Sequence, residues 1–204
     1  MIARNFALFC FVLGSLTLTL REDAGAASKG ATTPGTYRDW HGDIDEVTIF
    51  QAFQLDAYND IAVESFDVSR VPLPNPKENT HAAVQAALST IKPAFIEGFR
   101  QNLRQKPGGP NPVRGKGQTL VIVARLTKLD PGSQAARYFA GFGAGAVKVE
   151  MTGDVVDARS RKVLIRFKQE RRSGFGAFGG AYGELFVRTA RQIGGDVADL
   201  LNAF

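Results

Sequence analysis

Alternation of apolar and polar positions predicts five β-strands in this chain. In the segment 147–155, for example, Val147, Val149, Met151 and Val155 are apolar and polar residues stand between most of them, as in strands that bury one face. The segment 119–129 is apolar on both faces in its early part, which indicates a central place in a sheet. Residues 157–161 have the composition of a hairpin loop. The predicted strands cover residues 47–55, 61–68, 119–129, 147–155 and 163–167.

Two amphipathic helices are predicted from apolar residues that recur every three or four positions. One covers residues 81–106, and the other covers residues 185–204 after a glycine-rich stretch. Pro93 lies inside the apolar stripe of the first helix, so we expect a kink or a split there. Gly194 and Gly195 are expected to weaken the middle of the second helix, because glycine is a poor helix former.

The order strand, strand, helix, three strands, helix predicts an α+β fold, a mixed α/β sandwich with helices packed on a mainly antiparallel sheet. Residues 46–204 are expected to form this single domain. Residues 27–45 are rich in glycine, threonine and other small residues without apolar periodicity, and they are expected to be a flexible tether. The expected core residues are Ile122, Val149 and Phe167 on the sheet and Phe95 and Leu200 on the helices.

The first 26 residues are typical of a secretory signal peptide. A basic residue precedes an uncharged, mostly apolar run over residues 6–20, which is short for a membrane-spanning helix of about 20 residues. Ala24 and Ala26 match the small-residue pattern of cleavage sites, so cleavage is predicted after Ala26 or one residue later. An uncleaved N-terminal anchor is the alternative. Cys10 follows Phe9 within the apolar run, so lipidation is not expected. The predicted location is therefore periplasmic or secreted.

Composition excludes several classes of protein. The chain has 204 residues, of which 44% are hydrophobic and 22% charged, which fits a globular domain rather than a disordered or fibrous chain. One cysteine cannot form an internal disulfide. His41 and His81 lie too far apart for a metal-binding motif, and no serine lies in a G-x-S-x-G elbow. We therefore expect no catalytic residue, metal or cofactor, although carboxylates distant in sequence could still meet in space.

Two glycine-rich stretches match nucleotide-binding motifs only in part. Residues 174–179 fit G-x-G-x-x-G, but no further strand and ribose-binding acid follow, so a loop is the simpler interpretation. Residues 114–117 resemble the end of a P-loop, but glycine replaces the serine or threonine that holds Mg²⁺. We interpret this second stretch as a basic turn.

The segment 137–145 permits two interpretations. It could be a surface loop that recognises a partner through Arg137, Phe139 and Phe142. The favoured interpretation is a tight crossing between two strands, in which glycines allow close backbone approach and the phenylalanine rings are buried. The sequence keeps both alternatives open.

Charge is distributed unevenly along the chain, whose formal net charge is +5. Residues 39–67 contain eight acidic residues and no lysine or arginine, whereas residues 159–172 contain seven bases and one acid. The acidic segment could fold against the basic strands and cancel their field. Alternatively, the bases could attract an envelope protein or an anionic membrane or lipopolysaccharide surface, with nucleic acid not expected. The candidate contact residues at strand ends are Arg161, Lys162, Arg171 and Arg172.

The sequence LTKLDPGSQAARYFAGFGAG at residues 126–145, and the hairpin and C-terminal helix that follow, resemble the DUF4410 family of bacterial secreted proteins and lipoproteins. Family members often carry glycine at the position of Arg161, and many carry a lipobox that this leader lacks. The resemblance implies an envelope protein similar to the small α/β domains of periplasmic assembly factors. It implies no catalytic residue, since the family is named for its unknown function.

The sequence therefore predicts a non-catalytic binding or assembly protein of the bacterial envelope. The alternative is a small-molecule-binding protein or hydrolase with a cleft near the glycine-rich loops. A flat surface would favour the first interpretation, and a deep pocket with converging polar groups would favour the second.

Overall fold

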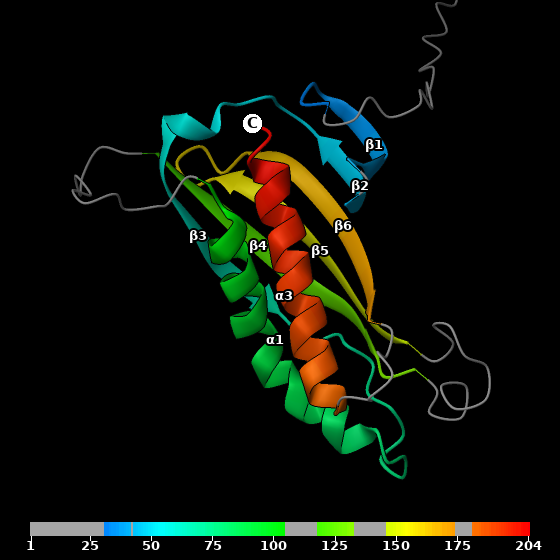
Figure 1. The fold of residues 1–204 in the computed structure, drawn as a ribbon. Coiled ribbons are helices and arrows are strands. Elements are labelled where there is room, and N and C mark those ends of the chain that lie inside the picture. Colours follow the sequence, from blue (N-terminus) through cyan, green and yellow to red (C-terminus); the bar gives the residue numbers. More distant parts are fainter. Residues whose placement is uncertain (1–30, 42, 105–117, 133–145, 174–180) are drawn as a thin grey trace, which may run out of the picture.

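The computed structural model describes residues 31–41, 43–104, 118–132, 146–173 and 181–204. Within these residues six strands form one sheet, and two helices lie side by side on one of its faces (Figure 1). This is the predicted α+β fold. The strands are β1 (Gly35–Trp40), β2 (Ile44–Ile49), β3 (Tyr58–Asp67), β4 (Gln118–Asp130), β5 (Val147–Asp157) and β6 (Val163–Ser173). The helical elements are η1 (Leu55–Ala57), α1 (His81–Asn102) and α3 (Tyr182–Leu201).

The sheet has the order β1-β2-β6-β5-β4-β3 and is mainly antiparallel, as predicted. The one parallel pair is β3 with β4, and α1 makes the crossover that joins them. Because β4, β5 and β6 alternate in direction, β6 runs the same way as β3 and β4. Helix α3 follows β6 and packs beside α1 (Figure 1).

The five expected core residues are all buried. Phe167 lies opposite Gly153 in the register of β5 and β6. A Cβ atom at Gly153 would lie only 2.7 Å from Cε1 of the Phe167 ring. The missing side chain at Gly153 therefore gives this ring its place in the sheet core.

Strand β1 corrects the expectation of a tether through residue 45. It pairs with β2 in antiparallel register, and its last residue, Trp40, is only 2% exposed. The indole Nε1 of Trp40 donates a hydrogen bond to the carbonyl of Ala31 at 3.0 Å. The sequence pattern missed β1 because this edge strand buries Trp40 and leaves most of its other side chains exposed, so apolar alternation is absent.

The two helices approach each other closely where both carry glycine. A Cβ atom at Gly194 would lie 2.8 Å from the backbone nitrogen of Phe99, and one at Gly98 would lie 2.7 Å from the carbonyl carbon of Arg191. Both distances are shorter than normal van der Waals contact. Gly194 thus permits close packing of α3 against α1, and α3 is unbroken at this residue. This corrects the expectation that Gly194 weakens the middle of the helix. Helix α1 likewise continues through Pro93 without a split.

Candidate functional site

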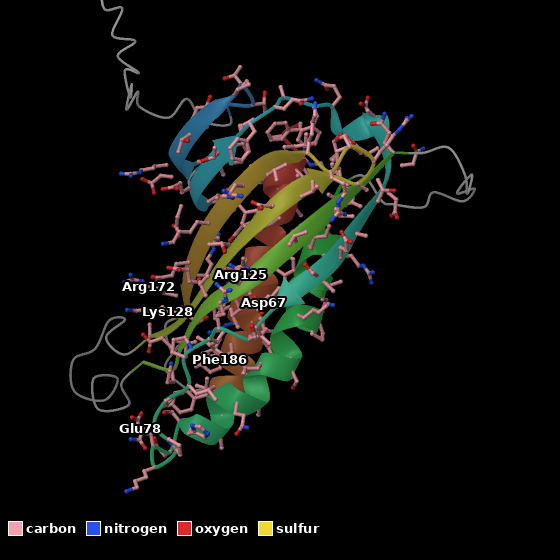
Figure 2. All side chains as sticks on the ribbon, turned by 180° about the vertical axis from the view of Figure 1, so that it is seen from behind. Asp67, Glu78, Arg125, Lys128, Arg172 and Phe186 are labelled. Carbon is pink, nitrogen blue, oxygen red and sulfur yellow. The ribbon has the colours of Figure 1, made fainter. Side chains whose placement is uncertain are left out.

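The face of the sheet turned away from the helices carries mainly polar and charged side chains (Figure 2). We call this surface the open face. On β4, β5 and β6 it takes the residues that alternate with the buried core positions. Its charged residues include Arg38, Glu46, Asp67, Arg125, Lys128, Asp130, Lys148, Glu150, Asp154, Arg166, Lys168, Glu170 and Arg172.

Ion pairs join neighbouring strands across the open face. Arg166 of β6 contacts Asp154 of β5 at 2.7 Å through Nε, and its Nη2 donates a second hydrogen bond at 3.1 Å. Arg125 of β4 contacts Asp67 of β3 at 3.1 Å between Nε and Oδ2. Each exposed pair is worth at most about 1 kcal/mol. Such cross-strand pairs nevertheless favour one register over its alternatives.

The sign of the charge alternates from strand to strand across the open face. Lys168 on β6 is flanked by Glu46 on β2, its register partner, and by Glu150 on β5, whose carboxylate lies 3.3 Å from its ammonium. The basic strands are β1 (Arg38), β6 (Arg166, Lys168, Arg172) and β4 (Arg125, Lys128), and the acidic ones are β2 (Glu46), β5 (Glu150, Asp154) and β3 (Asp67). The exceptions are Glu170, Lys148 and Asp130, which lie toward the end of the sheet where β6 and β4 finish.

These ion pairs bear on the uneven distribution of charge along the chain. The acidic segment does fold against the basic strands, as the Arg125–Asp67 pair shows. Arg161 likewise lies 3.5 Å from Glu64 of β3. The open face is therefore a lattice of balanced charge rather than a uniformly basic surface.

Of the predicted contact residues, those that the structure describes do not form one patch. Arg161 and Lys162 lie in the turn before β6, and Arg172 lies near the other end of that strand. Ten extended residues separate the ends by about 33 Å. Arg137, Phe139 and Phe142 lie outside the described residues.

Arg161 adopts a left-handed backbone conformation with φ +59°. Glycine reaches this region without steric cost, whereas other residues occupy it rarely. The turn is closed by Asp157, whose carboxylate accepts the backbone N–H of Ser160 at 2.6 Å. Hydrogen bonds from the Ser160 side chain and from this N–H hold the pKa of Asp157 below its ordinary value. Arg161 is thus placed by turn geometry.

Arg171 serves the fold, which corrects its expected role as a free surface base. Its Nε donates to Oδ2 of Asp196 at 2.7 Å, and its Nη2 donates to the other oxygen at 2.5 Å. Asp196 lies on α3 with a side chain only 9% exposed. Burial raises the pKa of Asp196, while the Arg171 guanidinium opposes that shift. Hydrogen bonding to Asp196 in turn raises the pKa of Arg171.

Gln169 extends this buried network to the β1–β2 hairpin. Its amide nitrogen donates to the Asp196 carboxylate at 2.9 Å and to the carbonyl of Asp43 at 2.6 Å. Its amide oxygen accepts the N–H of Asp45 at 2.9 Å. The network therefore connects α3, β6 and the start of β2 by hydrogen bonds. Its members are far apart in the sequence, so their spacing did not indicate it.

The described residues bring no set of polar groups together in a deep pocket. A shallow, open hollow of about 570 Å³ lies on the outer surface of α1. It is lined by Lys92, Pro93, Ile96, Glu97, Arg100 and Gln101. Among the residues that the structure describes, no cluster of histidine, cysteine and carboxylate side chains has metal-binding geometry. None of the helices in those ranges is long and apolar enough to cross a membrane.

Fold and surface together define a small α+β protein with one helix-covered and one open sheet face. The family described as "Domain of unknown function (DUF4410)" matches residues 61–177, more than half of the chain. The protein belongs to this family, which confirms the resemblance seen in the sequence. No curated protein matches the chain significantly.

Solved structures show weak overall similarity to this chain. One is the PelC dodecamer from Paraburkholderia phytofirmans, 12% identical, covering 74% of this chain and 96% of that one with a TM-score of 0.36. A second is a Xanthomonas campestris protein of family DUF330, 14% identical, covering 72% and 85% with a TM-score of 0.35. A third is lipoprotein GNA1162 from Neisseria meningitidis, 19% identical, covering 62% and 90% with a TM-score of 0.25.

Proposed function

We propose that this protein is a non-catalytic binding or assembly protein of the bacterial cell envelope, and that it holds a protein partner on its open face. The observation that carries the proposal is the contrast between the two faces of the sheet. One face is covered by α1 and α3, while among the described elements no helix covers the other (Figures 1 and 2). A broad, flat surface of this kind suits recognition of another macromolecule better than enclosure of a small substrate.

Charge balance favours a protein partner over an anionic membrane or lipopolysaccharide surface. Arg166 and Arg125 each have a carboxylate within 3.1 Å, so little positive field extends into solvent above them. Attraction to an anionic surface requires unbalanced charge of one sign. A lattice of both signs instead specifies a partner whose own charges match it in position.

Export is part of the proposal, with cleavage after Ala26 and no lipid attached. The apolar run at residues 6–20 and the small residues that follow it support export by a cleaved signal peptide. N-terminal sequencing of protein from the periplasmic or secreted fraction should give a mature terminus at Ala27 or one residue later. Recovery of soluble cytosolic protein that retains Met1 would contradict export.

Charge reversal on each surface tests the docking face. Arg125→Glu with Lys168→Glu changes the open face, and Lys92→Glu with Arg100→Glu makes the same net change on the exposed side of α1. We expect the open-face variant to lose its partner in capture from envelope extract, and the α1 variant to retain it. Equal loss in both variants, matched by equal loss of binding to phosphatidylglycerol vesicles, would show attraction to anionic surfaces instead.

A further inference from the structure

We propose that a second copy of this chain docks on the open face and forms a twofold-symmetric dimer. This inference rests on the proposed function, because it names the partner of the same surface. It is carried by the order of charges across the sheet, which runs basic, acidic, basic, acidic, basic, acidic from β1 to β3. An alternating pattern over an even number of strands is complementary to its own reversed copy.

The symmetry axis follows from the strand order. The twofold axis is parallel to the strands and lies between the two open faces, midway between β6 and β5. It places the first strand of the sheet order opposite the last strand of the second copy, the second opposite the fifth, and the third opposite the fourth. Basic β6 then faces acidic β5 of the second copy, and basic β4 faces acidic β2. Arg166 lies opposite Asp154 of the second copy, and the symmetry repeats this contact once more. The interface is isologous, as in most homodimers.

The residues that break the alternation, Glu170 and Lys148 among them, also lie near opposite charges in the dimer. Glu170 is in register with Glu150, and Arg172 is in register with Lys148, so the stacked copies would bring like charges together in these two rows. The rows have opposite sign and are only about 7 Å apart along the strands. Lysine and arginine side chains span that step, as Lys168 already does within one copy when it reaches Glu150. The complementarity is therefore strongest around Arg166.

The size of the surface predicts a weak dimer. Six strands spaced about 4.8 Å apart, over about eight residues each, give a flat area of about 600 Å² per copy. A standard stable interface buries about 800 Å² per partner. Val123, which is 37% exposed, contributes apolar area near the centre, but the surrounding surface is charged. We expect self-association in the micromolar range, weakened by salt.

Two single charge reversals test the inference. Arg166→Asp places two carboxylates opposite each other at both symmetry-related contacts, and Asp154→Arg places two cations there. Sedimentation velocity over the micromolar range should show self-association of the native protein and at least about tenfold weaker association of each variant, since like charges oppose binding. An equimolar mixture should associate again. In the mixed dimer one contact joins the two introduced charges and the other joins the native Arg166 of one chain to the native Asp154 of the other, so both contacts are attractive.

The mixture distinguishes a loss of the interface from a loss of the folded structure. Both variants lose the same intramolecular pair between Arg166 and Asp154, and mixing cannot restore that pair within either chain. Circular dichroism of each variant provides the check on folding. A native protein that is monomeric throughout, association that neither reversal weakens, or a mixture that fails to recover would each overturn the inference. Loss of another captured protein in the open-face variant alone would still support the proposed function.

Discussion

Replacing Gly194 with alanine tests the close contact between α1 and α3. A Cβ atom at this position would lie 2.8 Å from the nitrogen of Phe99 and closer still to the carbonyl oxygen of Phe95. Both are backbone atoms of a helix, so they cannot turn aside as a flexible side chain would. The methyl group therefore requires the helices to separate by more than about half an ångström, against close-packed surroundings.

Two opposing effects set the size of the change. Alanine stabilises a helix interior by about 1 kcal/mol relative to glycine. Overpacking of a well-packed core costs about 1–3 kcal/mol and sometimes more, and the collision with rigid backbone belongs at the upper end of that range. We expect Gly194→Ala to lower the free energy of unfolding by about 2 kcal/mol.

Gly183→Ala provides the matched control in the same helix. Apart from its chain neighbours and the nearby backbone of α3 itself, no atom lies within 4 Å of a Cβ placed at Gly183, so only the gain in helix propensity remains. We expect this variant to be more stable than the native protein by about 0.5 kcal/mol. Urea titration at constant m-value measures both changes. Equal or higher stability of Gly194→Ala would refute the close helix contact.

Three further predictions concern the sheet and its polar network. Phe167→Ala should lower the free energy of unfolding by about 3–5 kcal/mol, since the ring is buried, and a loss below about 1 kcal/mol would show that the strand faces are misassigned. Arg171→Ser should lower the free energy of unfolding by about 3 kcal/mol, because it leaves the buried Asp196 carboxylate without its cation. Arg172→Ser should lower it by less than about 1 kcal/mol. Equal losses in the two variants would argue against the buried network. The pKa of Asp157 is lower in the folded protein than in the unfolded chain, so the unfolded chain binds the proton more tightly. The ionised Asp157 carboxylate therefore stabilises the fold above pH 3.8, and this contribution is lost as the pH falls through the folded pKa. Asp157→Asn should therefore flatten the acid side of the stability–pH profile, and an unchanged profile would contradict this assignment.

Apolar periodicity predicted the elements that bury one face, because burial is what such patterns record. Val149 and Phe167 alternate with charged residues that are less buried, so their place in the core could be predicted directly. Strand β1 escaped prediction because it lies at the sheet edge and most of its side chains remain exposed. In that element, pairing with β2 determines the conformation, and single-residue patterns do not record pairing.

Contacts between segments distant in sequence explain the other corrections. Gly194 is costly in an isolated helix, and its benefit becomes visible only when α1 is placed against it. Arg171 has the sequence signature of a surface base, and its partner Asp196 lies on another element. The charge lattice has the same origin, since Arg125 meets Asp67 only after β3 and β4 pair.

Site-specific photo-crosslinking tests the central claim that the open face is the docking surface. A photoreactive amino acid is introduced at Val123, near the middle of the open face, or at Gln101, on the exposed side of α1, and the mature protein is irradiated in envelope extract. We expect a discrete crosslinked product from position 123 and none from position 101. Products from position 101 alone, or the same products from both positions, would contradict docking on the open face.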